Sequence, residues 1–218
     1  MIYENLVEKI MQHYSSGDHT PEVIQAKKEF FEQAGVFDET SDEFEWKAGQ
    51  FMDWYVFSRT DKQSQRTPVE LAAREQGLKL TPEEQGALVN LINHRHSLFE
   101  FKKIKGSDVH IQDLFSGYKH IVKNSPVTEG FDRGQVFEAR IIPHEDYFLF
   151  SKAFCFHPAQ AYKFILKEVK DVKKLPAEEQ SEARKRLIAR LFRMRSKYDQ
   201  YRHVDVLEIY SNESKLRL

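Results

Sequence analysis

Cysteine is almost missing from this chain, because Cys155 is the only one among its 218 residues. A single thiol cannot form an internal disulfide bond, which favours a reducing compartment and argues against the disulfide-stapled secreted class. The first residues, Met1 to Glu8, have neither the basic nor the apolar region of a signal peptide, and no stretch reaches the roughly 20 apolar residues that span a bilayer. The sequence therefore predicts a cytoplasmic protein without a membrane partner.

The short motifs of well-known chemistries are also missing. The sequence has no nucleophile elbow, no glycine-rich phosphate loop, no zinc-protease helix and no dinucleotide-binding fingerprint. We therefore expect no cofactor, and an enzyme is the less favoured class.

The composition is that of a globular protein, with a formal net charge of −1. The charge is unevenly distributed, because residues 1–60 hold 12 acidic and 5 basic side chains and the rest of the chain carries +6. A chain of this kind either closes its acidic part on its basic part or presents the basic part to a partner.

Helical patterns fill the first 96 residues. Apolar side chains recur at helical spacing from Ile2, and an acidic run at 38–43 leads into an aromatic-rich helix that begins near Phe44. The segments Thr67–Glu70 and Thr81–Glu84 each place threonine at the N-cap, proline at the first helical position and glutamate at the third, which is a capping box.

The apolar period changes from helical to two at Ser97 and returns to helical near Pro158. Five short strands within about 60 residues predict a small, curved antiparallel sheet or a partly open barrel. A long helix is then expected from Ala177 to about Tyr201. The predicted fold class is α+β, with a helical region at 1–96, a small β-barrel-like unit at 97–156 and a C-terminal helical arm at 157–218, packed as one unit.

The long helix holds the first candidate site. Four cations follow one helical face and are called the basic stripe below: Arg186, Arg190, Arg193 and Lys197. Such a line could follow a phosphate backbone or meet an acidic protein surface. Alternatively, the arginines dock on the acidic first third of the chain or form a solvated face.

An apolar seam runs beside the basic stripe on the same helix. Its spacing of four, three, four and three residues is that of a helix pair, formed within one chain or between the two chains of a homodimer. The members of the apolar seam are Leu187, Leu191, Met194, Tyr198 and Tyr201.

The β unit is the second candidate site, because small barrels can bind oligonucleotides with exposed aromatic and basic side chains. The ordinary alternative is an amphipathic sheet with no partner. The relevant side chains are Lys102, Lys103, Lys105, Tyr118, Lys119, Lys123, Arg133, Arg140 and Tyr147, of which we favour Lys102, Tyr118, Lys119 and Arg140.

Metal and catalytic sites are not predicted. His94 and His96 form the only close histidine pair, at a helix-to-strand junction where their geometry is open, and no spacing rule adds His110, Cys155 or His157 as ligands.

The segment around Cys155 is aromatic, so this cysteine is interpreted as a buried apolar side chain and not as a nucleophile. The pair His203 and Asp205 lies at a helix end, where capping explains it; a deep pocket shared with His157 would instead favour an enzyme.

Several segments together resemble an uncharacterised bacterial family in which a helical N-terminal region precedes a small β unit. They are Phe51–Phe57, Ser97–Phe101, Asp113–Gly117, Gly134–Arg140 and Phe154–Pro158. The resemblance covers roughly residues 45–160 and implies a bacterial cytoplasmic protein. It implies no activity and no catalytic residue.

The sequence thus favours a non-enzymatic binding or adaptor protein of unknown partner. The alternative is a nucleic-acid-binding protein that uses the β unit and the basic helix at 184–202 against phosphate.

Overall fold

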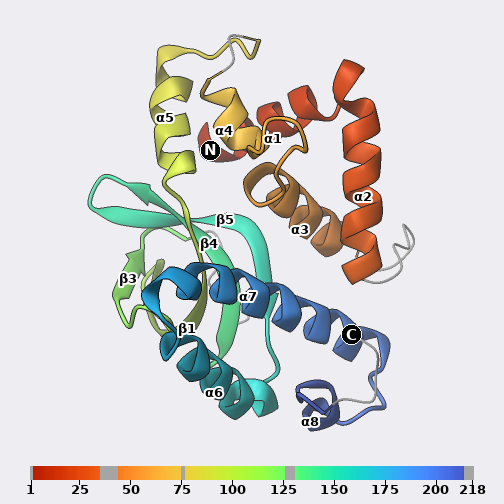
Figure 1. Ribbon diagram of the computed structural model, residues 1–218. Helices are drawn as coiled ribbons and strands as arrows, with labels where there is room; N and C mark the ends of the chain where they lie inside the picture. Colours follow the sequence, from red (N-terminus) through yellow and green to blue (C-terminus); the bar gives the residue numbers. More distant parts are fainter. Residues whose placement is uncertain (1, 35–43, 75–76, 126–130, 214–218) are drawn as a thin grey trace. The chain divides into compact units, whose positions relative to one another are not determined.

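The structure is a computed structural model that describes residues 2–34, 44–74, 77–125 and 131–213 (Figure 1). It divides into two compact units. Unit 1 comprises residues 1–95 with 142–144 and 151–153, and unit 2 comprises 96–141, 145–150 and 154–218. The predicted sheet and the C-terminal helices therefore belong mainly to the same unit.

Unit 1 is built from helices, as the apolar spacing predicted. They are α1 (Ile2–Tyr14), η1 (Gly17–His19), α2 (Thr20–Ala34), α3 (Phe44–Phe57), α4 (Pro68–Ala72) and α5 (Pro82–Ile92). Both capping boxes are formed, at the first turns of α4 and α5. The acidic run at 38–43 lies outside the described residues.

The sheet of unit 2 has five strands that close into a ring in the order β1-β2-β3-β5-β4. The strands are β1 (Arg95–Lys105), β2 (Asp108–Asp113), β3 (Lys119–Val122), β4 (Val136–His144) and β5 (Tyr147–Phe156). Alternate side chains point inward and fill the ring, so its interior is a packed core. The buried members are Phe99, Phe101, Val109, Ile111, Val122, Phe137, Ala139, Ile141 and Phe154.

The sheet is mixed, whereas the sequence predicted only antiparallel strands. β1–β2 and β2–β3 are antiparallel, but β3 pairs with β5 in parallel at Val122 and Phe148. The reason is geometric, because strands in a closed ring of five cannot all alternate in direction. At least one neighbouring pair must be parallel.

Helices cover part of the outer side of the ring: η2 (Ala159–Ala161), α6 (Tyr162–Lys173), α7 (Ala177–Gln200) and α8 (Val206–Ile209) (Figure 1). Their apolar sides form a second core with Leu98 of β1 and Val136 of β4. None of the helices in the described part of the chain is long and apolar enough to cross a membrane.

The apolar seam of α7 is part of this second core. Leu187, Leu191 and Met194 are buried, Tyr198 packs against them, and Tyr201 at the helix end is 40% exposed. Side chains of α6, α8 and the sheet thus occupy the seam. Burial of Leu187, Leu191 and Met194 thus favours the alternative in which the seam packs within one chain over a homodimer formed through it.

Candidate functional site

The outer side of β1, β2 and β3 presents a group of basic and aromatic side chains. The register sets Lys103 opposite His110, and His110 opposite Ile121, so alternate residues of three strands share one face. We call this group the lysine face; its members are Lys103, Lys105, His110, Lys119 and Ile121. Tyr118 comes directly before Lys119, at the start of β3.

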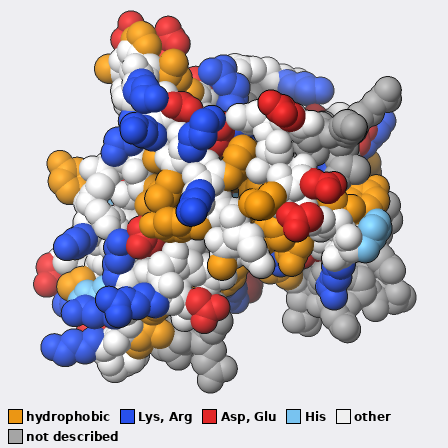
Figure 2. Space-filling view, turned by 90° about the horizontal axis from the view of Figure 1, so that it is seen from below, with side chains coloured by type: hydrophobic (Ala, Val, Ile, Leu, Met, Phe, Trp, Pro, Cys, Tyr) orange, Lys and Arg blue, Asp and Glu red, His pale blue; other side chains and the backbone are white. Residues whose placement is uncertain are grey.

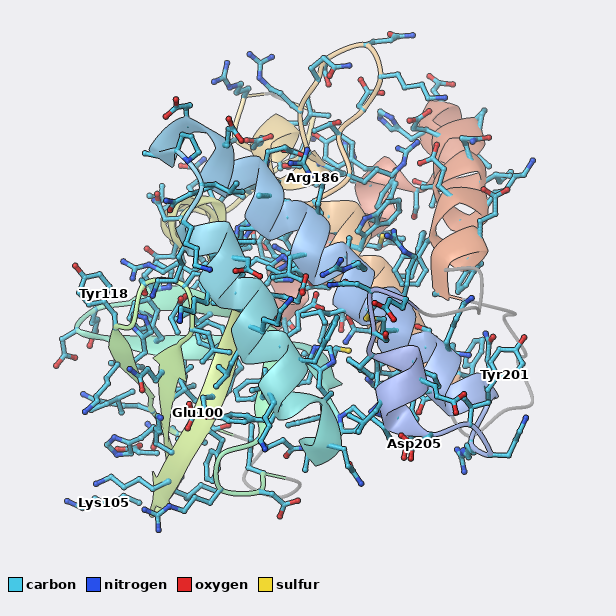
Figure 3. The ribbon with its side chains drawn as sticks, turned by 60° about the horizontal axis from the view of Figure 1, so that its bottom comes forward. Glu100, Lys105, Tyr118, Arg186, Tyr201 and Asp205 are labelled. Atoms are coloured by element: carbon cyan, nitrogen blue, oxygen red, sulfur yellow. The ribbon has the colours of Figure 1, made fainter. Side chains whose placement is uncertain are left out.

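The lysine face and the neighbouring Tyr118 are open to solvent. Tyr118 is 70% exposed and Ile121 is 42% exposed, and Lys103, Lys105 and Lys119 are also exposed. In Figure 3, Tyr118 and Lys105 point outward at opposite ends of the sheet. Figure 2 shows basic side chains close to a histidine on one face of the molecule. An exposed tyrosine ring can stack on a planar group, and a lysine next to it can bind an anion.

The three lysines of the lysine face form no ion pair among the described residues. The nearest acid in register is Asp108, opposite Lys105, and its carboxylate accepts a hydrogen bond from the Asn124 N–H at 3.2 Å. Their ammonium groups therefore face water.

The predicted site residues of the β unit separate into two groups. Tyr118 and Lys119 are exposed, and Lys119 lies on the lysine face; that they bind a partner stays a prediction. Lys102 instead pairs with Glu100 at 2.7 Å, next to an irregularity in the β1–β2 register. Arg140 is 2% exposed, so its prediction as a surface contact is wrong. Because both faces of β4 are buried, the strand alternation there does not turn polar residues to water.

The remaining members of the predicted set border other features. Lys123 pairs with Asp146 and lies over the Tyr147 ring. Arg133 lines a cavity of about 380 Å³ together with Asp132, Gly134, Gln135, Val136, Pro158, Ala159 and Tyr162. The lining of this cavity does not include His157, His203 or Asp205.

The basic stripe of α7 is interrupted. Arg190 makes an ion pair with Glu168 of α6 and donates a hydrogen bond to the Asn212 side chain at 3.1 Å. Arg186 is exposed, as Figure 3 shows, while Arg193 and Lys197 are half-buried. The stripe therefore offers no continuous line of free cations, because Arg190 is engaged by Glu168 and Asn212.

Two further arginines of α7 also turn inward. Arg184 donates to the His96 carbonyl and lies 3.7 Å from Asp113. Arg195 pairs with Asp199 at 2.9 Å and donates to the Phe156 carbonyl at 2.6 Å. The acidic partners of α7 thus come from unit 2 itself.

A buried cluster of polar side chains lies on the outer side of β4 and β5. We call it the Glu-Cys-His cluster: Glu138, Cys155 and His157 each offer a donor atom, and these atoms lie within 4.8 Å of one another. Among the described residues no other group of three histidine, cysteine or acidic residues meets this spacing.

Burial dominates the electrostatics of the cluster. It raises the pKa of Glu138 to about 8, against the opposing charge of Arg140. It lowers the pKa of His157 to about 3, and Arg195 adds to this effect. It also raises the pKa of the Cys155 thiol. In the metal-free protein near neutral pH, the imidazole and the thiol are therefore neutral.

Sequence reasoning missed this cluster. His94 and His96 do not form a joint site, because His94 bonds to the Leu91 carbonyl and His96 to Glu138. The spacing of Cys155 and His157 was a usable signal, since residues two apart in an extended segment share a face.

Residues 2–205 match a family of unknown function, DUF7986. The chain belongs to this family. The predicted resemblance to an uncharacterised family is confirmed, while a bacterial source stays a prediction. Searches of curated proteins and of solved structures find no match.

The match covers both candidate sites of this DUF7986 chain. It includes the lysine face and the Glu-Cys-His cluster, and it ends before Tyr210, which contacts His157. Because the family has no stated function, what DUF7986 members do must be inferred from the sites themselves.

Proposed function

We propose that this chain is a non-enzymatic, cytoplasmic binding protein that holds single-stranded nucleic acid on the lysine face. The observation that carries the proposal is the 70% exposure of Tyr118 next to the exposed Lys119. Lys103 and Lys105 lie further along the sheet, toward the far end of β1, and form no ion pair among the described residues. Bases of a single strand stack on exposed aromatic rings, and lysines hold the phosphates between them.

The charge of unit 2 supports a polyanionic partner. Its residues include 22 lysines and arginines against 17 aspartates and glutamates. The lysine face is a better candidate than the basic stripe, because its lysines have no acidic partner among the described residues, whereas Arg190 is paired.

Fluorescence anisotropy with labelled oligothymidine and oligouridine, measured over a series of salt concentrations, tests the proposal. Three lysines against phosphate predict that the logarithm of the binding constant falls by about 2 per tenfold increase in salt. Tyr118→Ala should weaken binding by about 5- to 150-fold, the equivalent of one stacked base at about 1–3 kcal/mol.

A matched pair of charge reversals separates a specific face from net charge. Lys103→Glu with Lys119→Glu should abolish binding, while Lys163→Glu with Lys170→Glu, which changes exposed lysines of α6 by the same charge, should leave most of it. Equal losses in both double variants would mean that any basic surface suffices.

The absence of any anisotropy change at low salt would remove nucleic acid as the partner. The adaptor interpretation would then take its place, with an acidic protein surface against the same lysines.

A further inference from the structure

We propose that Glu138, Cys155 and His157 form a zinc-binding site inside unit 2. This site is separate from the lysine face, and its test does not depend on the proposed function.

The strand pairing brings the three side chains together. The backbone N–H of His157 donates a hydrogen bond to the Val136 carbonyl at 3.0 Å. Continued along the antiparallel pair, this register sets Glu138 opposite Cys155. Cys155 and His157 are two residues apart in an extended segment, so they share the face on which Glu138 lies. Phe154 and Phe156 point the other way, into the ring.

Two donor atoms of the cluster have no partner. Glu138 Oε2 and His157 Nε2 are fully buried and make no hydrogen bond within the described structure. Most buried polar atoms are hydrogen-bonded, and an orphan pair at one place points to a bound species. As whole residues, Glu138 is 9% exposed and His157 is 1% exposed.

The other polar atom of each of these two side chains makes a hydrogen bond. Glu138 Oε1 lies 2.7 Å from His96 Nε2, and His157 Nδ1 lies 3.0 Å from the Tyr210 hydroxyl. Such outer contacts orient metal ligands and fix the imidazole tautomer. With Nδ1–H donating to Tyr210, Nε2 of His157 carries the lone pair that can bind a metal ion.

The donor set suits zinc. Thiolate, imidazole and carboxylate are its three common protein ligands, whereas Mg²⁺ and Ca²⁺ prefer oxygen alone. Bond lengths of about 2.0–2.3 Å place tetrahedral ligands roughly 3.5 Å apart. The donor atoms lie within 4.8 Å of one another, so each pair needs to approach by up to about 1.3 Å, and water can fill the fourth position.

Charge balance also favours a divalent ion. On binding, the Cys155 thiol loses its proton to solvent, and so does Glu138 where it is protonated. One thiolate and one carboxylate then neutralise Zn²⁺, which gives a neutral buried centre. The other charged groups near the cluster are Arg140, Arg195 and the Asp199 that pairs with Arg195.

Cobalt(II) titration of the metal-stripped full chain tests the site, because Co²⁺ replaces Zn²⁺ in tetrahedral sites and its thiolate bond absorbs in the near ultraviolet. We expect one Co²⁺ per chain, a thiolate band, and loss of the band on addition of Zn²⁺. Since Cys155 is the only cysteine, the band reports this site alone.

Three variants complete the test. Cys155→Ser should remove the thiolate band. Glu138→Gln keeps size and shape and should lower zinc affinity by at least tenfold. Tyr210→Phe should lower it by about 10- to 100-fold, as loss of an outer contact does. His203→Ala, an exposed histidine elsewhere in unit 2, should change nothing.

If a variant does not fold, the proposal can still be tested in the wild-type chain, by measuring how far zinc protects the Cys155 thiol from alkylation. In the wild-type chain, zinc should slow alkylation of Cys155 in mild denaturant. A folded wild-type chain that takes up no Co²⁺, or takes it up without a thiolate band, would overturn the proposal and leave buried water as the partner of the two orphan atoms.

Discussion

Replacing Arg190 by alanine tests whether this member of the basic stripe serves binding or holds α7 in place. Its guanidinium pairs with Glu168, donates to Asn212 and lies over the Phe164 ring, with 5.8 Å between the guanidinium carbon and the ring centroid. Asn212 donates in turn to Glu168 at 2.9 Å. Truncation of Arg190 therefore leaves a mostly buried carboxylate with weaker partners.

The expected cost lies between those of a surface and a buried ion pair. Exposed pairs contribute about 0–1 kcal/mol, and removal of one partner from a buried pair costs about 3–5 kcal/mol. The side chains of Arg190 and Glu168 are 30% and 12% exposed, and Lys167 is 3.5 Å from the carboxylate as a substitute partner. We expect a loss of about 1–3 kcal/mol.

The loss should depend on pH. Burial acts to raise the pKa of Glu168, but hydrogen bonds from Asn212 and Arg190 outweigh it and hold the pKa below its ordinary value of 4.5. Stability gained from the ionised carboxylate is therefore present above pH 4.5 and is lost as the pH falls through the folded-state value. The difference between wild type and Arg190→Ala should narrow toward pH 3.

Urea unfolding followed by far-ultraviolet circular dichroism at pH 7 and pH 3.5 measures this difference. Trp46 and Trp54 are the only tryptophans and belong to unit 1, so indole fluorescence would not report on unit 2 directly. Arg186→Ala, one helical turn earlier and exposed, is the matched control and should cost less than about 0.5 kcal/mol. Equal losses for both variants, or a loss independent of pH, would refute the structural role of Arg190.

Three more variants have defined outcomes. In metal-free protein, the free energy of unfolding of Glu138→Gln minus that of wild type should rise by about 1.4 kcal/mol for each pH unit between pH 5 and 8. The reason is that burial raises the pKa of Glu138 to about 8 in the folded state, whereas the unfolded chain ionises near 4.5. Urea unfolding in the presence of chelator measures this difference, and a difference that does not change with pH would contradict it. Thr81→Ala removes the N-cap that accepts the Glu84 N–H and should cost about 1 kcal/mol in thermal unfolding. Leu191→Ala should cost about 2–5 kcal/mol, because the side chain is fully buried; a smaller loss, or a change of oligomeric state in gel filtration, would mean that the apolar seam is not a core element.

The elements of the fold were predictable because they depend on local chemistry. The capping sequence at Thr81 fixes where α5 begins, and the change of period at Ser97 marks the first strand within two residues of its observed start at Arg95. The parallel pairing of β3 with β5 was not predictable in this way. It follows from closure of the ring, which no single segment encodes.

The candidate site was predictable only where strands face water. Lys119 is the first residue of β3, whose alternate residues are exposed, so period and exposure agree there, and the exposed Tyr118 comes directly before it. Arg140 belongs to a strand whose first seven residues are all buried. Alternation distinguishes the two faces of a strand, but it does not tell whether the outer face meets solvent or another layer of protein.

Sequence spacing likewise does not tell which cations of the basic stripe meet solvent and which meet protein. Helical spacing placed Arg186 and Arg190 on one face of α7, and they do share it. Their surroundings differ because α6 brings Glu168 beside Arg190 only. The position of α6 is set by the second core, and therefore by contacts far apart in the sequence.

Placing Glu138 and His157 in a dry interior has an energetic consequence. Each orphan polar atom costs about 1–3 kcal/mol, so the two together cost about 2–6 kcal/mol. That is a large part of the roughly 5–15 kcal/mol by which a domain is stable. Each of the two side chains has a ligand atom within 4.8 Å of the Cys155 sulfur, and the other polar atom of each orphan's side chain is hydrogen-bonded. A single ion bound to all three donors would offset the cost at both atoms at once, whereas a water molecule could satisfy them only by hydrogen bonds, without using the sulfur. The sulfur is therefore the atom whose behaviour distinguishes a metal from a water at this position.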